Sequence, residues 1–186
     1  MKEEGDYYHL YNRGNNRQQI FFQEEDYSYF LKQFKHFLCP HIDVFAYCLM
    51  YNHFHFFIRI KNQIAFEKGI KNFLISYSKS INKKYDRVGS LFQGRYKLSE
   101  ITSDAYFTRI ITYIHQNPMV AGIEKELGEY KYCSYMAYLS NKNSMLSRQE
   151  VLEWFGDIDG FIADHEITEH KLILEDFCKA TDEVKS

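Results

Sequence analysis

Alternating hydrophobic and polar residues predict the strands of this chain. Residues 7–12 are expected to form a first strand, which stops at the polar turn 13–16. Residues 42–50 and 53–60 are predicted as two strands with a break of two residues, which favours an antiparallel hairpin. Residues 89–98 read as a loop that runs into a fourth strand.

Hydrophobic residues at helical spacing predict helices over residues 24–38, 66–85 and 105–117. The order strand, helix, strand, strand, helix, strand, followed by a helix, predicts an α+β protein with a ferredoxin-like βαββαβ sandwich. We assign residues 1–145 to this domain. Residues 146–186 are expected to form an acidic helical appendage, with a capping box at Ser147 and Glu150 and a second helix over 161–179.

Charge is unevenly distributed along the chain, whose net charge is −2. Residues 146–186 hold 4 Lys or Arg and 11 Asp or Glu. Subtracting these from the chain totals of 23 and 25 leaves 19 and 14 for residues 1–145, a balance of +5. Ten basic and two acidic residues lie between positions 59 and 97. Such a surplus can follow a phosphate backbone, although an ordinary solvated helix face has the same composition.

The four cysteines lie far apart and form no C-x-x-C pair, which is typical of a reducing compartment and predicts no zinc site. The N-terminus lacks the apolar core of a signal peptide, and no apolar run approaches the ~18 residues that span a membrane. We therefore expect a soluble intracellular protein without a membrane partner.

The strand predicted over residues 53–60 has two faces, because strand side chains alternate. One face is hydrophobic, and the other holds His53, His55, Phe57 and Arg59. Two imidazoles on neighbouring positions of one strand face can converge on a single metal ion. Taken alone, an H-x-H pair is weak evidence, since most such pairs are half-exposed histidines.

Tyr113 and Asn117 lie four residues apart on the helix predicted over 105–117, and so on the same side of it. A phenol beside an amide can supply a nucleophile and an oxygen ligand. Alternatively, both residues have structural roles only: the tyrosine packs against its neighbours, and the asparagine ends the helix before Pro118. His115 is expected at the surface.

Four segments keep a particular order and spacing: N-R-G-N-N at 12–16, M-Y-N-H-F-H at 50–55, G-R-Y at 94–96 and Y-I-H-Q-N-P at 113–118. Together they resemble the REP-associated tyrosine transposases, within the IS200-like, single-tyrosine HUH (histidine-hydrophobic-histidine) group. The similarity runs from about Tyr7 to about Tyr138. Two positions depart from the family pattern. Tyr51 replaces a usual proline, and residues 118–122 lack the basic residue usual before Ala-Gly.

The resemblance implies a cytoplasmic, nucleoid-associated enzyme that cuts and rejoins single-stranded DNA near hairpin repeats. Tyr113 would be the nucleophile, and His53, His55 and Asn117 would hold Mg²⁺ or Mn²⁺. A phenol with an ordinary pKa of ~10 needs such help at neutral pH. The expected product is a 5′ phosphotyrosine with a free 3′ hydroxyl, and the reverse reaction onto another 3′ hydroxyl transfers the strand. A monomer and a homodimer both remain open.

The DNA partner, single-stranded or hairpin, is expected to meet basic side chains mostly through its phosphates. The residues expected to contact phosphates are Arg13, Arg59, Lys61, Lys79, Lys83, Lys84, Arg87 and Arg95. Tyr96 is expected to stack on unpaired bases.

Two other functions fit part of the sequence. A domesticated relative that binds hairpin DNA without cutting it would keep the same fold. A replication initiator or relaxase is the other candidate, but those HUH enzymes have longer, multidomain chains, and this sequence contains no helicase-like P-loop.

Overall fold

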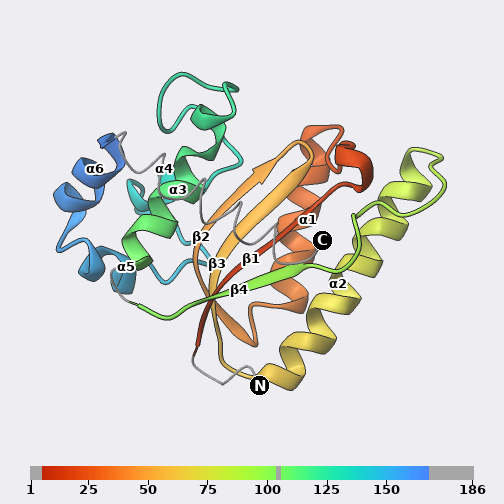
Figure 1. Cartoon of the computed structure of the whole chain (residues 1–186), viewed down its shortest axis with the longest axis horizontal. Helices are drawn as coiled ribbons and strands as arrows, with labels where there is room; N and C mark the ends of the chain where they lie inside the picture. Colours follow the sequence, from red (N-terminus) through yellow and green to blue (C-terminus); the bar gives the residue numbers. More distant parts are fainter. Residues whose placement is uncertain (1–5, 104–105, 168–186) are drawn as a thin grey trace.

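A four-stranded sheet forms the centre of the computed structural model, which describes residues 6–103 and 106–167 (Figure 1). Its strands are β1 (Tyr7–Arg13), β2 (Ile42–Met50), β3 (His53–Ile60) and β4 (Lys97–Ile101). They lie in the order β2-β3-β1-β4, and all three pairings are antiparallel. With the helices between them, the strands form the predicted ferredoxin-like sandwich.

Helices cover both faces of this sheet (Figure 1). On one face, α1 (Glu24–Phe37) and α2 (Gln63–Lys84) pack side by side. On the other face, α3 (Phe107–Val120) packs on β2 and β3. The short helices on the side of α3 are α4 (Tyr135–Tyr138), α5 (Arg148–Trp154) and α6 (Ile158–Glu166).

Both faces of β3 carry buried hydrophobic side chains, whereas the sequence predicted a hydrophobic stripe on one face only. Phe56 points toward α1, where its ring stacks on Phe34 with centroids 3.9 Å apart. Phe57 points the other way and is fully buried against Phe107, with centroids 5.5 Å apart. His53 therefore lies on the α3 face of the sheet, at the start of the strand.

Two helices have different bounds from those predicted. The α2 helix begins at Gln63, one turn before residue 66, because the Asn62 side chain accepts a hydrogen bond from the Ala65 N–H and caps it there. The α3 helix continues through Pro118 to Val120. A proline has no N–H to donate and its ring crowds the carbonyl four residues back, but in the last turn both effects stay local, so the helix does not have to stop there.

The described part of the acidic C-terminal region packs into the core of the main domain. Val151 and Phe161 are fully buried in the same hydrophobic cluster as the sheet residues. The predicted capping box is absent, since the Ser147 side chain makes no cap hydrogen bond and Glu150 instead bonds Arg59. The helix predicted over 161–179 has other bounds, since it begins at Ile158 and ends at Glu166, where Ile167 is extended; residues 168–186 lie outside the described ranges.

Asp26 is a buried carboxylate that joins the start of α1 to the end of α2. Burial raises the pKa of this carboxyl, but hydrogen bonds from Lys84, Tyr85 and the backbone N–H groups of Phe22 and Gln23 outweigh burial and lower it. Because the folded pKa lies below the unfolded value of about 3.9, the ionised group stabilises the fold above that pH. This contribution is lost as the pH falls through the folded pKa.

We therefore expect Asp26→Asn to lower the free energy of unfolding at pH 7 by about 1–3 kcal/mol. As the pH falls through the lowered pKa of Asp26, the variant and the wild type should converge, because both then carry a neutral group. Urea unfolding at a series of pH values from 7 downward measures this difference. The neighbouring exposed carboxylate offers a control, since Glu25→Gln should change little. Equal stability of Asp26→Asn and wild type at pH 7 would contradict the prediction.

Candidate active site

Strands β1 and β3 and helix α3 bring the predicted histidines and tyrosine together. The His53 and His55 rings lie with their centroids 5.0 Å apart on the face of β3 toward α3. The antiparallel register sets Arg13 opposite His53 and Tyr11 opposite His55. The Tyr113 ring of α3 stands edge-on to His55, at 5.8 Å between centroids.

Asn117 completes the arrangement on the His53 side. Its Oδ1 lies 3.3 Å from His53 Nε2, while His53 Nδ1 lies 2.6 Å from Asn52 Oδ1. An amide oxygen only accepts, and the neutral ring has one hydrogen for two such oxygens; the much shorter contact assigns it to Nδ1, so Nε2 presents a lone pair. The His53 nitrogen and the Asn117 oxygen are then two acceptors that face each other, an arrangement that a cation between them would stabilise.

His9 of β1 is the site residue that the sequence did not predict. It is 1% exposed, and its Nε2 lies 2.9 Å from His55 Nδ1. The two rings are stacked, with centroids 5.0 Å apart and planes at 18°. Strand alternation places His9 on the same face as Tyr11, but the register against β3 that brings it beside His55 has no local signal in the sequence.

All three imidazoles are held in the neutral form. Burial lowers the pKa of His9 to about 3 and that of His55 well below its ordinary value, where His53 and His9 lower it further. Burial also lowers the pKa of His53; the hydrogen bond that the protonated ring would donate to Asn117 opposes this effect, and the charge of Arg13 adds to it. Neutral imidazole is the form that binds metal ions.

The donor atoms fit a small divalent ion. Among the described residues, no group of three or more His, Cys, Asp or Glu side chains is placed to hold a metal, so a metal ion here would need the Asn117 amide as its third protein ligand. Adjacent ligands of octahedral Mg²⁺ lie about 3 Å apart. The 3.3 Å between His53 Nε2 and Asn117 Oδ1 is close to that value. Two nitrogens with one oxygen suit Mn²⁺ at least as well as Mg²⁺.

A pocket of about 430 Å³ opens beside these residues. None of the Asp or Glu residues that the structure describes lines it, whereas three tyrosines and three basic residues do: Tyr11, Tyr51, Tyr113, Arg13, Arg17 and Lys97. Cations and aromatic rings around a cavity without carboxylates favour an anionic ligand that carries flat rings. A nucleotide has both features.

The N-R-G-N-N segment forms the wall of this pocket together with the loop before β4. Backbone hydrogen bonds join Asn15 to Leu91 and Gln93 to Arg13. At Gly14 any side chain would collide, because an added Cβ would lie 2.0 Å from the Gln18 carbonyl oxygen. The close approach that only glycine allows here keeps Arg13 at the pocket.

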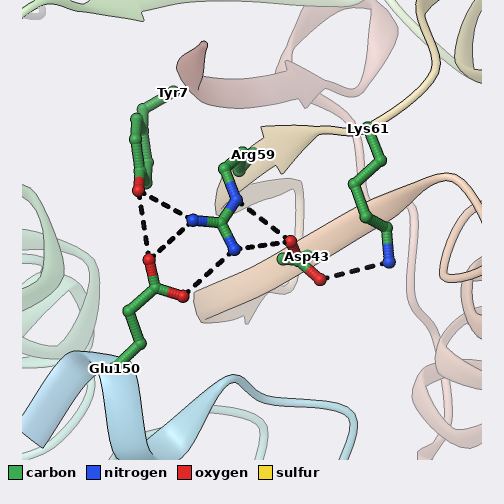
Figure 2. A network of polar contacts seen from close by, with 5 residues as sticks. All are labelled: Tyr7, Asp43, Arg59, Lys61 and Glu150. Carbon is green, nitrogen blue, oxygen red and sulfur yellow. Dashed lines mark hydrogen bonds and ion pairs between the residues drawn. The ribbon is translucent and has the colours of Figure 1, made fainter. Parts of the chain in front are cut away.

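Two of the predicted DNA contacts, Arg59 and Lys61, lie at the far end of β3 from His53 (Figure 2). The Arg59 guanidinium donates to Asp43 Oδ2 at 3.0 and 2.8 Å and to both Glu150 oxygens at 2.7 and 3.1 Å. It also donates to the Tyr7 hydroxyl, and Lys61 pairs with Asp43 at 3.1 Å. Neither residue lines the pocket.

The other predicted contacts are spread over α2 and the loop before β4. Lys84 pairs with Asp26 at 2.7 Å, and Arg87 donates to Gln18 at 2.7 Å. Three further basic residues are exposed, namely Lys79, Lys83 and Arg95. Tyr96 is half-buried. Of the whole predicted set, only Arg13 lines the pocket, which also has Arg17 and Lys97 beside it.

The expectation that His115 lies at the surface was wrong, since it is 2% exposed. Its Nδ1 lies 2.8 Å from His165 Nε2, and its Nε2 lies 2.7 Å from Ser134 Oγ. The adjacent Gln116 donates to the His165 carbonyl. The α6 helix covers this face of α3, and helical periodicity within α3 gave no sign of that cover.

Comparison with known proteins agrees with this fold. The structure of the REP-associated tyrosine transposase bound to a REP hairpin matches with a TM-score of 0.63 and 13% identity, over 75% of this chain and 82% of that one. At that identity the match establishes the fold. A comparison with curated proteins gave no significant match. No helix within residues 6–103 and 106–167 is long and apolar enough to cross a membrane.

The family model for IS200-like transposases matches residues 4–117 of this chain. That segment is more than half of the sequence, and it contains the histidine pair, Tyr113 and Asn117. The family resemblance seen in the sequence is thereby confirmed. The chain belongs to the IS200-like transposase family.

Proposed function

We propose that this protein cuts and rejoins single-stranded DNA beside hairpins, with Tyr113 as nucleophile and His53, His55 and Asn117 as ligands of Mg²⁺ or Mn²⁺. The observation that carries the proposal is the pair of facing acceptors, His53 Nε2 and Asn117 Oδ1, beside the pocket that His53, His55 and Tyr113 line. The family match and the hairpin bound to the similar transposase support DNA as the substrate.

In this mechanism the Tyr113 hydroxyl oxygen attacks a backbone phosphorus and loses its proton. The bond from phosphorus to the 3′ oxygen breaks, and that oxygen takes up a proton. The phosphate stays on the tyrosine, at the 5′ end of the cut strand. When bound, the metal ion would polarise the phosphate oxygens and offset their developing charge. Attack by another 3′ hydroxyl reverses the step and joins a new strand without ATP.

The size and the lining of the pocket support a substrate that is single-stranded at the cut. A space of about 430 Å³ accepts one unpaired nucleotide, whereas a base held in a duplex must first leave its stack. Tyr51, which is 45% exposed at the pocket, offers a ring on which an unpaired base can stack. Arg13 and Arg17 are suited to the flanking phosphates.

Incubating the protein with labelled hairpin oligonucleotides and Mn²⁺ tests the proposal. The oligonucleotides should carry single-stranded flanks and cover the inverted repeats next to the gene. We expect a protein–DNA adduct that survives denaturing electrophoresis, disappears with EDTA and is lost in His53→Ala. His36→Ala, at an exposed position on α1, should keep it. Tight binding without an adduct across the whole set would instead support a non-catalytic hairpin-binding protein.

DNA binding should weaken steeply with salt, and the pocket arginines should carry part of this dependence. Each of Arg13→Ala and Arg17→Ala should reduce the slope of log K against log salt by about 1, the value for one lost phosphate contact. Lys61→Ala removes a charge that already pairs with Asp43 and serves as control. Fluorescence anisotropy at several salt concentrations measures the slopes. A flat salt response of the wild type would rule out the phosphate contacts.

A further inference from the structure

The buried hydrogen bond between His9 and His55 has a direct consequence for metal binding. We infer that His9 is a positioning residue that fixes the tautomer of His55, so that His55 Nε2 presents its lone pair to the ion. The inference rests on the proposed function, because it assigns a role to His9 in building that metal site.

The proton positions in the pair follow from its geometry. One hydrogen lies between His9 Nε2 and His55 Nδ1, which are 2.9 Å apart. If His9 donates it, His55 Nδ1 accepts, and the neutral His55 ring carries its own hydrogen on Nε2, where it blocks a metal ion. If His55 donates it, His55 Nε2 is free as a ligand. Binding of an ion to His55 therefore requires His9 Nε2 to be the acceptor.

Burial restricts His9 to this role. The His9 ring is 1% exposed and stacks on both Tyr11, at 4.7 Å, and His55, at 5.0 Å. Its Nε2 is directed at the back of the His55 ring, so this nitrogen is not available as a further metal ligand. A positioning histidine behind a ligand histidine acts as the carboxylates and carbonyls behind other metal-bound histidines do.

We expect His9→Leu to weaken Mn²⁺ binding by about 10- to 100-fold, the usual effect of losing such a partner. His9→Gln keeps a side-chain acceptor and should recover affinity to within about fivefold of wild type. Leu10→Ala is the matched control: it destabilises the same strand from the opposite face and should leave the Mn²⁺ affinity unchanged. Calorimetric titration with Mn²⁺ in the presence of hairpin DNA measures these affinities.

A second measurement needs no metal. Long-range nitrogen–proton correlation spectra of ¹⁵N-histidine-labelled wild-type protein report which ring nitrogen carries the hydrogen. We expect His55 to be protonated on Nδ1 and His9 also on Nδ1. His55 protonated on Nε2, or wild-type Mn²⁺ affinity in a folded His9→Leu variant, would overturn the inference.

The two measurements separate this inference from the proposed function. If wild-type protein binds no Mn²⁺ with DNA, the proposed metal site fails, yet the tautomer spectrum still decides what His9 does to His55. If wild type binds Mn²⁺ and the His9→Leu variant binds it equally well, the metal site stands and the role of His9 falls.

Discussion

Tyr113→Phe is expected to abolish covalent attachment of the protein to DNA, by on the order of 10³-fold or more, because the hydroxyl that forms the bond is gone. Hairpin binding should persist, since the ring remains and the phosphate contacts are elsewhere. Denaturing electrophoresis of labelled hairpin DNA measures the adduct, and anisotropy measures binding.

Tyr106→Phe is the matched control for this loss. Tyr106 is an exposed tyrosine at the start of the same helix, so its replacement should leave the adduct intact. Tyr11, which also lines the pocket, makes the experiment decisive. If the adduct survives in Tyr113→Phe and is lost in Tyr11→Phe, the nucleophile has been assigned to the wrong phenol.

Arg59→Met is expected to cause a large loss of stability. The Arg59 guanidinium bridges Asp43, on the sheet, and Glu150, on α5, so its removal deprives Glu150 of its ion-pair partner and leaves Asp43 with Lys61 (Figure 2). Breaking a fully buried pair costs about 3–5 kcal/mol. With the arginine side chain 28% exposed, we expect about 2–3 kcal/mol here, measured by urea unfolding.

The same variant tests whether Arg59 contacts DNA. If its role is to join α5 to the sheet, hairpin affinity measured well below the unfolding transition should stay within about twofold of wild type. Lys61→Ala is the control for stability, since an exposed pair is worth about 0–1 kcal/mol. A stable Arg59→Met protein with weakened DNA binding would favour the phosphate contact predicted from the sequence.

Local sequence patterns predicted most of the fold. They also predicted two pairs of site residues, but not how these pairs meet. The alternation in β3 put His53 and His55 on one face, and helix spacing put Asn117 beside Tyr113. The structure brings the two sets together because α3 packs on β3. His9 escaped prediction because its contact with His55 depends on strand register across 46 residues of sequence.

Charge was the least informative pattern. A run of basic residues indicated a surface for DNA, but it gave no information on which cations already have partners. Glu150 lies 91 residues from Arg59, and the chain folds so that this carboxylate neutralises the arginine. Conversely, Arg17 lines the pocket from a turn that the charge count did not single out.

The α3 helix has buried polar groups on both sides, and this sets the size of the smallest fragment that can work. The family match stops at residue 117, in the last turn of the helix. Tyr113 and Asn117 face the pocket side, whereas His115 depends on Ser134 and His165. A fragment that ends where the sequence similarity ends would keep every proposed reacting group. It would lose the residues that pack on the outer side of α3, the helix that carries Tyr113 and Asn117. The functional unit therefore extends at least to His165, some fifty residues past the matched segment.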